Sequence, residues 1–257
     1  MPIFQQKKHH LTSSYDKKSA FLRKVFSLFF KTCGIIEEQF FVKKGVRMKK
    51  VAVFLARGFE EIEAITIIDY LRRAEIDVTT VAIPEKGSIE STALVMGSHC
   101  ISVVADMQLN VYLHSVGEHY PDAVFCPGGM PGSINIATCD PAVELIKRMH
   151  AAGKLVAAIC AAPVVVLAKT GILAGKKYTC YPGMEDDLAN YCGSAPKMDA
   201  LMKDSKLIRG VPFVFDQNVL TGRGPGTAEE YAMEFVRLLT DEATRNRLAK
   251  GACQRGY

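Results

Sequence analysis

The residue of this chain whose setting best suits chemistry is a cysteine at the end of an apolar run. Residues 155–159 are apolar or small, Cys160 follows them, and Ala161, Ala162 and Pro163 come next. A strand that breaks at a cysteine and turns into a helix forms a nucleophile elbow, in which the sulfur leaves the sheet and the helix N-terminus favours thiolate. The alternative is a structural cysteine, because free cysteine is often fully buried. The local pattern alone leaves both interpretations open.

A group of carboxylates offers a proton donor for such a thiolate. Glu60, Glu61 and Glu63 follow Gly58 at the start of a helical pattern. Carboxylates in a first turn complement the helix dipole and are mostly solvated, and Glu60 and Glu61 fit that description. The spacing of Glu63 can instead direct it toward the end of the sheet. Because two adjacent negative charges repel each other, Glu63 beside a thiolate would be neutral, able to donate a hydrogen bond and then shuttle its proton.

Glycine-rich turns supply further candidates. Gly128-Gly129 follows a buried strand, and its N–H groups could stabilise an oxyanion, although a turn that merely needs positive φ explains the pair equally well. The string Gly222-Arg-Gly-Pro-Gly226 precedes a helix but lacks the spacing and the early position of a dinucleotide fingerprint. The sequence also has no Walker A motif. These turns therefore favour an active site over a nucleotide site.

The histidines do not provide an evident base for the cysteine. His99 lies near Gly97 and could reach a pocket, whereas His114, His119 and His150 stand in polar or helix-end contexts. No histidine directly follows Cys160 and no His-x-Glu occurs after it, which weakens protease and glutaminase interpretations.

The elements that must position these residues alternate between strand and helix. The sequence predicts strands over 50–55, 78–83, 94–105 (one or two, interrupted at Gly97), 123–126, 155–159, 178–181 and 213–221, and helices over 60–74, 140–152, 163–169 and 227–239. This alternation indicates an α/β fold with a mostly parallel sheet covered by helices on both faces. Ligands of such sheets bind beyond the carboxyl ends of the strands. Cys160 and the three glycine turns fall at such ends, which favours the nucleophile interpretation.

Composition and charge exclude other classes. The chain is 49% hydrophobic and 23% charged, which is ordinary for a globular protein. Residues 1–47 carry ten basic and three acidic residues, a formal charge of +7, so a total of +5 leaves −2 for the rest. A basic face for nucleic acid is therefore not expected over 48–257. The eight cysteines follow no paired spacing, which predicts reduced thiols of a cytoplasmic protein and no metal site.

Residues 1–47 differ in character from the rest of the chain. They form a basic extension whose apolar stretch, residues 21–30, is too short and too interrupted to span a bilayer or to act as a secretory signal. Met48 begins a clean first strand, so the domain is expected over 48–257, with 1–47 either an upstream mis-start or a targeting or accessory segment.

Four ordered motifs resemble those of the ThiJ/PfpI superfamily, in the branch of the Parkinson disease protein deglycase and its bacterial relatives. The motifs are Arg57-Gly-Phe-Glu-Glu-Ile-Glu63, Cys126-Pro-Gly-Gly129, Ala157-Ala-Ile-Cys160-Ala-Ala-Pro163 and Thr221-Gly-Arg-Gly-Pro-Gly-Thr227. The resemblance covers about residues 49–248. It implies a flavodoxin-like sandwich, a homodimer, and no metal or organic cofactor. It also implies that Cys160 is the nucleophile, that Glu63 is its protonated partner, and that Gly129 and Ala161 donate N–H groups to an oxyanion.

The chain departs from this family at two positions. Tyr181, before Pro182, stands where many members carry a histidine, and tyrosine is a poor base because its pKa is about 10. His99 stands where a relative has an arginine, and Arg223 could compensate as an anion contact. We expect His99, Tyr181 and Arg223 to bind substrate.

The residues and the resemblance together predict a cofactor-free cysteine enzyme that is not a protease. Its expected substrates are methylglyoxal, glyoxal or their early adducts with proteins or nucleotides, and its products 2-hydroxy acids. The alternative is an oxidative-stress sensor or redox chaperone that uses oxidation of Cys160. No membrane association and no sequence-specific nucleic-acid binding are expected.

Overall fold

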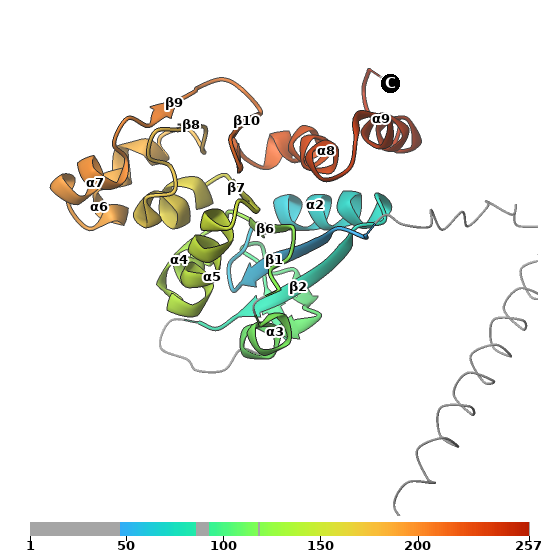
Figure 1. Cartoon of the computed structure of the whole chain (residues 1–257), viewed down its shortest axis with the longest axis horizontal. Helices are drawn as coiled ribbons and strands as arrows, with labels where there is room; N and C mark the ends of the chain where they lie inside the picture. The colour runs from blue at the N-terminus through green and yellow to red at the C-terminus, as the bar shows by residue number, and fades with distance from the viewer. Residues whose placement is uncertain (1–46, 86–92, 118, 257) are drawn as a thin grey trace, which may run out of the picture. The chain divides into compact units, whose positions relative to one another are not determined.

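The structure is a computed structural model that describes residues 47–85, 93–117 and 119–256. The predicted extension therefore lies, apart from Arg47, outside the described residues. The centre of the fold is a seven-stranded sheet, mostly parallel (Figure 1). Its strands, in spatial order, are β10 (Phe213–Asp216), β11 (Val219–Gly222), β7 (Leu155–Ile159), β6 (Ala123–Cys126), β1 (Lys50–Ala56), β2 (Asp77–Ile83) and β5 (Met107–Gln108). Within this seven-stranded sheet of the described residues, β10–β11 is the one antiparallel pair.

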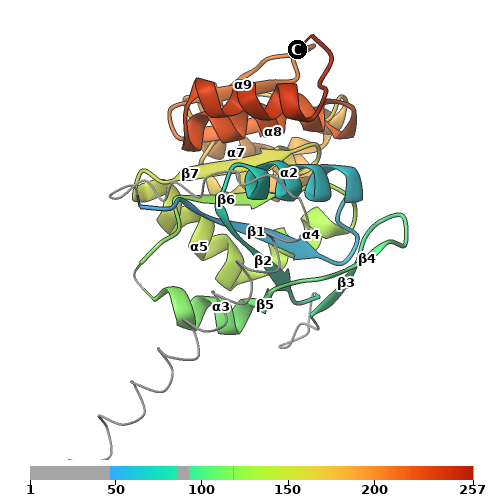
Figure 2. The same ribbon diagram turned by 90° about the vertical axis from the view of Figure 1, so that its right-hand side faces the viewer.

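Helices cover both faces of this sheet, as the sequence predicts. Figures 1 and 2 show α2 (Glu61–Arg73) and α8 (Ala228–Leu239) on one face and α4 (Gly132–Thr138) and α5 (Asp140–Ala151) on the other. A further helix, α3 (Leu109–Val116), lies beside β2 and β5. Strands β1, β6 and β7 are almost entirely buried, which explains why they are near-continuous apolar runs rather than alternating patterns.

Helix α2 packs through one apolar face and is hydrogen-bonded to α8. The buried side chains of α2 recur at helical spacing, at Ala64, Ile67, Ile68 and Leu71. The Tyr70 hydroxyl donates a 2.5 Å hydrogen bond to Glu229, which ties α2 to α8. The start of α2, where Glu63 lies, therefore belongs to a helix whose buried face extends from its first turn to Leu71.

The strand order reverses beside β1, and this reversal defines the crevice of the fold. From β1 the chain passes to β2 and β5 on one side and then returns to β6 and β7 on the other. In open α/β sheets, ligands bind outside the carboxyl ends of the strands at such a switch point. The turns after β1, β6 and β7 carry Gly58, Gly128-Gly129 and Cys160, so the candidate residues gather there.

Several predicted elements differ in detail from those observed. The segment 94–105 forms two strands, β3 (Leu94–Met96) and β4 (Ser102–Val104), which pair as a separate hairpin. The single strand predicted over 213–221 is wrong, because the chain turns at Gln217, whose φ is 56°, and returns as β11. The helix predicted over 163–169 is instead a π-helical turn, Pro163–Leu167, followed by a 3₁₀ turn, Ala168–Thr170.

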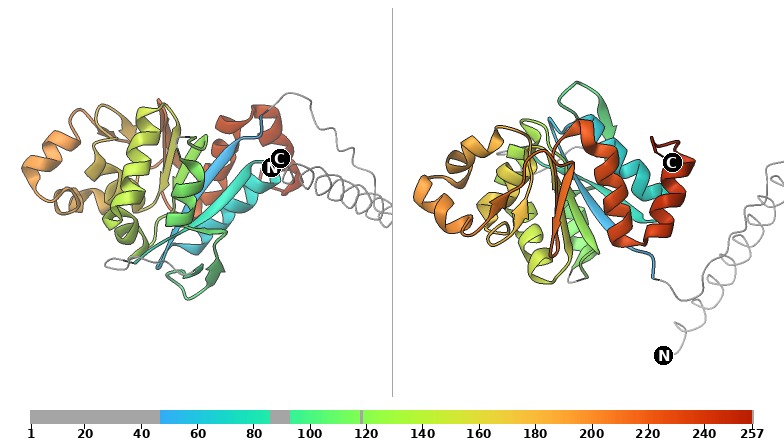
Figure 3. Two further views of the ribbon diagram at one scale, coloured as in Figure 1. Left: turned by 60° about the horizontal axis from the view of Figure 1, so that its bottom comes forward. Right: turned by 90° about the horizontal axis from the view of Figure 1, so that it is seen from above.

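The remaining elements flank the sheet. The strand predicted over 178–181 is the two-residue β8 (Lys177–Tyr178), paired with β9 (Lys206–Leu207). The remaining helices are α6 (Leu188–Cys192), α7 (Ala195–Leu201) and α9 (Glu242–Gly251). Figure 3 shows α6 and α7, in orange, at the opposite end of the described unit from α9, in red. No helix in the described ranges is both long and apolar enough to cross a membrane.

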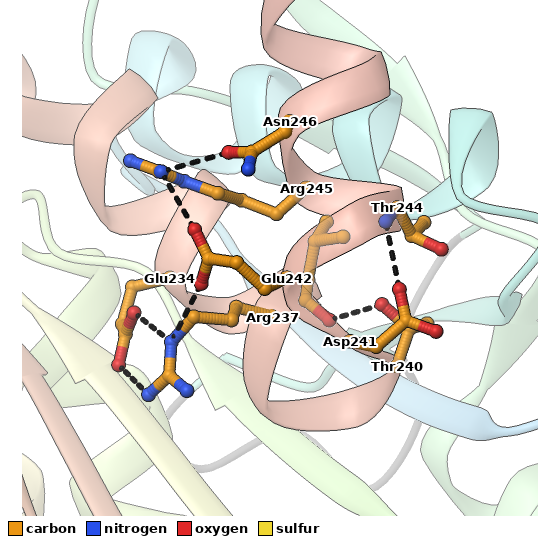
Figure 4. Close-up of polar contacts among 9 residues, drawn as sticks. Glu234, Arg237, Thr240, Asp241, Glu242, Thr244, Arg245 and Asn246 are labelled. Atoms are coloured by element: carbon orange, nitrogen blue, oxygen red, sulfur yellow. Dashed lines mark hydrogen bonds and ion pairs between the residues drawn. The ribbon is translucent and has the colours of Figure 1, made fainter.

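Polar contacts connect the C-terminal helices α8 and α9 (Figure 4). Arg237 on α8 makes two 2.7 Å hydrogen bonds to Glu234 and also approaches Glu242 on α9. Asp241 caps α9 by accepting a 2.7 Å hydrogen bond from the Thr244 N–H group. Such a cap contributes about 1 kcal/mol, whereas exposed ion pairs contribute less.

Candidate active site

Cys160 has the backbone of a nucleophile elbow. Its φ is 63°, a left-handed value that is costly for a residue with a side chain and that two hydrogen bonds hold in place. The Cys160 N–H group donates to the Gly222 carbonyl, and its own carbonyl accepts from the Tyr181 N–H group, both at 2.9 Å. Cys160 keeps 9% of its surface exposed, whereas the flanking Ala158 and Ala162 are fully buried. The turn thus holds the thiol at the edge of the core with a small opening to solvent.

Glu63 is the buried carboxyl group beside this thiol. It is fully buried on the first turn of α2, and the Gly128 N–H group donates a 2.8 Å hydrogen bond to its Oε2. The carboxyl group and the Cys160 thiol are hydrogen-bonding neighbours that alter each other's pKa. Among the described residues, no nitrogen or oxygen is within hydrogen-bonding geometry of Glu63 Oε1. This buried oxygen therefore accepts no hydrogen bond that would compete with protonation of the carboxyl group.

Gly128 lies between the two side chains, and the site has no room for a larger residue there. A Cβ at this position would lie 2.5 Å from Cys160 Cβ, 2.7 Å from Glu63 Oε2 and 3.0 Å from Cys160 Sγ. These separations are all shorter than ordinary contacts between such atoms. Glycine is thus required by the close approach of thiol and carboxyl group, rather than by the positive φ that the sequence alternative suggested.

Burial and mutual charge set the pKa values of the pair. Burial raises the pKa of Glu63 to about 8, and nearby Glu60 adds to this rise, although the hydrogen bond from Gly128 opposes it. Burial also raises the pKa of the Cys160 thiol, and the negative charge of an ionised Glu63 raises it further. The backbone N–H groups of Gly129 and Ala161 act in the opposite direction, because they donate to the sulfur. Burial therefore raises both pKa values, and the titrations of the two groups are coupled because the groups are in contact.

The two N–H groups come from two separate turns that meet at Cys160. Ala161 directly follows Cys160, whereas Gly129 belongs to the turn after β6 and has a φ of 86°. A Cβ on Gly129 would collide with the backbone of residues 58–60, so this turn packs directly on the start of α2. The structure therefore brings together Cys160, Glu63, Gly129 and Ala161, the four residues expected at the centre of the site.

The expectation that Glu60 and Glu61 are solvated is wrong. Both are buried, with 7% and 5% of their surfaces exposed. Glu60 caps α2 by accepting a 2.7 Å hydrogen bond from the Glu63 N–H group, a role that its position three residues before Glu63 could have suggested. Glu61 accepts hydrogen bonds from the backbone N–H of His99 at 2.6 Å and from Ser98 Oγ at 3.2 Å. The β3–β4 hairpin, which the sequence did not place over α2, buries these carboxylates.

His99 lies on this hairpin rather than beside the thiol. Its Nδ1 is 2.8 Å from Glu61 Oε2, and its side chain is 70% exposed. The Glu61 carboxylate raises the pKa of the imidazole by hydrogen bonding to it. No contact between His99 and the Cys160–Glu63 pair exists among the hydrogen bonds of the described residues, so a part in substrate binding stays a prediction.

One donor set among the described residues could accommodate a metal ion. Ligand atoms of Glu60, Glu61 and His99 lie within 4.8 Å of one another. Their hydrogen bonds already use these groups for capping α2 and for holding the hairpin. We assign no metal to them.

Tyr181 and Arg223 lie on the two loops that hold the elbow. The N–H group of Tyr181 donates a hydrogen bond to the Cys160 carbonyl, and its ring packs on Gly224 although the residue is 48% exposed. Arg223 follows Gly222, the hydrogen-bond acceptor of the Cys160 N–H group, and its side chain is exposed. Tyr181 thus contacts Cys160 directly, Arg223 is next to a residue that does, and substrate binding by them stays a prediction.

Fold and site together define a flavodoxin-like α/β protein with a cysteine at the elbow of its switch-point crevice. The model of the DJ-1/PfpI family matches residues 49–238, and the chain belongs to this family.

Its relatives include plant and animal proteins. It is 35% identical to Protein DJ-1 homolog B of Arabidopsis thaliana, over 74% of this chain and 38% of that protein, so the chain spans about two fifths of that relative. It is 34% identical to Protein dj-1beta of Drosophila melanogaster, over 79% of this chain and 96% of that protein. The crystal structure of Drosophila DJ-1beta superposes with a TM-score of 0.67 at 32% identity, covering 80% of this chain and 98% of that one.

A third relative carries an enzyme name. The chain is 31% identical to Glutathione-independent glyoxalase DJR-1.2 of Caenorhabditis elegans, over 76% of this chain and 90% of that protein.

Proposed function

We propose that this chain is a cofactor-free, cysteine-dependent glyoxalase or deglycase. It would act on methylglyoxal, glyoxal or their early adducts with proteins or nucleotides, and release 2-hydroxy acids. The observation that carries the proposal is the buried Glu63 beside Cys160, whose pKa of about 8 keeps the carboxyl group protonated at neutral pH. The relative named as a glutathione-independent glyoxalase supports the same reaction class.

The proposed reaction needs a protonated Glu63 and a negatively charged Cys160 sulfur. A thiolate would receive N–H groups from Gly129 and Ala161 and an O–H group from Glu63, whereas a Glu63 carboxylate would receive the Gly128 N–H group and a weak thiol donor. A carboxylate would also face the charge of Glu60. Once Glu63 is neutral, its charge no longer raises the pKa of the thiol. The balance of donors thus favours thiolate and carboxylic acid.

The chemistry follows from these two groups. The thiolate attacks the aldehyde carbon of methylglyoxal, and Glu63 protonates the resulting oxyanion to give a hemithioacetal. The Glu63 carboxylate then removes the proton from this carbon to give an enediolate. The hydroxyl proton moves to the neighbouring oxygen and Glu63 returns its proton to the neighbouring carbon, which leaves a thioester of the 2-hydroxy acid. Water hydrolyses the thioester and restores the thiol. One carbon is oxidised as its neighbour is reduced, so no external oxidant is needed.

Gly129 and Ala161 would stabilise the oxyanion in the addition and hydrolysis steps. Their N–H groups already point at the sulfur, which places them beside any oxygen that develops on the attached carbon. One donor of this kind typically contributes about 10²–10³ in rate. We propose Tyr181, Arg223 and His99 as the groups that contact the rest of the substrate.

An isotope measurement tests this scheme in the unmodified protein. The purified chain should form lactate from methylglyoxal without glutathione or another added thiol. In D₂O the lactate should carry deuterium at the carbon bearing the hydroxyl, because the Glu63 carboxyl proton exchanges with solvent. Absence of lactate would refute the function.

We also propose that two copies associate through an exposed apolar face. The large exposed hydrophobic residues of α2 and of the β3–β4 hairpin form this face: Ile62, Ile65, Leu94, Ile101 and Val104. A monomer rarely leaves so many apolar side chains exposed on neighbouring elements. A cytoplasmic location is proposed because the cysteines of the described residues are free thiols.

The Ile62→Asp variant tests the dimer. Ile62 is 57% exposed on α2, so the substitution should leave the fold intact and place a charge in the interface. Light scattering should give twice 28.2 kDa for the unmodified chain and a single copy for the variant. A monomeric unmodified chain would contradict the proposal.

The redox-sensor alternative rests on the same thiolate. Cys160 is only 9% exposed, which does not favour oxidation over turnover. This function stays a prediction of the sequence.

A further inference from the structure

The ring of Tyr181 and the backbone of Gly224 form a contact at the edge of the elbow. Gly224 is buried, whereas Tyr181, whose ring packs on it, is 48% exposed. A Cβ added to Gly224 would lie 3.2 Å from Tyr181 Cδ2 and 3.7 Å from Cε2, and it would meet no other atom of the described residues within 4 Å. The ring therefore rests directly on the glycine backbone.

Both partners of this contact are fixed to the nucleophile through short backbone connections. Tyr181 donates its N–H group to the Cys160 carbonyl, and Gly222, two residues before Gly224, accepts the Cys160 N–H group. The loops 180–182 and 222–224 consequently flank the elbow, and the ring spans from one to the other. The contact with Gly224 supports the ring on the side of the 222–224 loop.

We propose that Gly224 is a positioning residue that sets the place of the Tyr181 ring, and that this ring is a wall which limits the size of molecules reaching Cys160. For the substrate class, this inference rests on the proposed function. For access to the thiol, it rests on the hydrogen bonds that attach both loops to the backbone of Cys160 and on the contact between the ring and Gly224. The wall would select small dicarbonyls over those with a bulky group beside the aldehyde.

The conformation of Gly224 makes it a clean test position. Its φ of 161° and ψ of −174° are extended values that alanine also adopts, so Gly224→Ala introduces no backbone strain. Its effect should come from the Tyr181 ring, which must shift to accept a contact of 3.2 Å. Gly226 provides the matched control in the same loop, because a Cβ there meets no atom of the described residues within 4 Å.

The experiment measures access to Cys160 without any substrate. Iodoacetamide serves as the small reagent and N-phenylmaleimide as the bulky one, and mass spectrometry follows the peptide that contains Cys160. The free-energy cost of moving a ring off its preferred rotamer corresponds to a factor of about two to ten. Gly224→Ala should therefore change, by about that factor, the ratio of the N-phenylmaleimide rate to the iodoacetamide rate at Cys160. Gly226→Ala should keep the ratio of the unmodified chain.

A second background shows whether Gly224 acts through the ring. In Tyr181→Ala the ratio should rise in favour of the bulky reagent, and adding Gly224→Ala should then have no further effect. A Gly224→Ala effect that persists without the ring, or an unchanged ratio in the single variant, would overturn the proposal. If the chain is active, Gly224→Ala should change the ratio of the KM for phenylglyoxal to the KM for methylglyoxal. It should leave kcat for methylglyoxal unchanged. If the unmodified chain is inactive but Gly224→Ala alters the alkylation ratio, the proposed function is refuted and the role of the Tyr181 ring as a wall is supported.

Discussion

The Cys160→Ser variant should lose about a thousandfold or more of the rate at which the chain forms lactate from methylglyoxal. A hydroxyl group is a weak nucleophile without a strong base, and the neutral Glu63 cannot act as one at the first step. Serine retains the size of the side chain and can accept the N–H groups of Gly129 and Ala161. The loss should therefore appear in catalysis and not in folding, and discontinuous lactate assays on the two proteins would measure it.

Cys253→Ser is the matched control for this variant. Cys253 is an exposed free cysteine near the C-terminus, and its φ of 56° reproduces the left-handed backbone of Cys160. Its replacement should leave the rate unchanged. Equal rates for Cys160→Ser and the unmodified chain would eliminate covalent catalysis by this thiol.

The Glu63→Gln variant should lower kcat by about 10²–10⁴, the usual contribution of a positioned acid–base group. Glutamine has the same shape, and its amide oxygen can accept the hydrogen bond that Gly128 donates to Glu63 Oε2. It cannot move a proton between carbon atoms, so the hemithioacetal would form and then persist. Accumulation of the adduct on Cys160, detected by intact-protein mass spectrometry, should accompany the lower kcat.

The role of Glu63 also predicts the direction in which activity changes with pH. Burial raises the pKa of Glu63 to about 8, so the carboxyl group keeps its proton below that pH and loses it above. Activity of the unmodified chain should therefore fall as pH rises through about 8, whereas the residual activity of Glu63→Gln should show no such fall. Glu230→Gln, at an exposed position of α8, is the control and should match the unmodified profile. A Glu63→Gln variant with full activity would contradict proton transfer by this group.

The sequence predicted the position of the site better than its internal contacts. Alternating apolar runs predict a parallel sheet, and the ends of its strands then place Cys160, Gly129 and Glu63 at one edge, because the topology leaves few other arrangements. The motif order adds the identity of the family. These patterns give the positions of the residues along the chain, and the fold then brings those residues close together.

The parts that sequence could not predict depend on contacts between distant segments. Glu60 and Glu61 look solvated from their helical setting, but the hairpin carrying His99 folds over them. The turn at Gln217 carries no glycine or proline, and Asp216 and Asn218 give only a weak local signal for the reversal into β11. The contact between Tyr181 and Gly224 joins positions 43 residues apart in the chain, and only the two loops at the elbow bring them together.

The central claim is that Cys160 is a thiolate beside a protonated Glu63, and the pH dependence of its alkylation tests that claim directly. In one sample, mass spectrometry would follow the iodoacetamide reaction of Cys160 and of the exposed Cys253 from pH 4 to pH 10, with Cys253 as the internal reference. An ordinary cysteine has a midpoint of about 8.5, and we expect that of Cys160 to lie at least about one unit lower. A Cys160 midpoint equal to or above that of Cys253 would contradict the claim, because burial would then outweigh the donors that surround the sulfur.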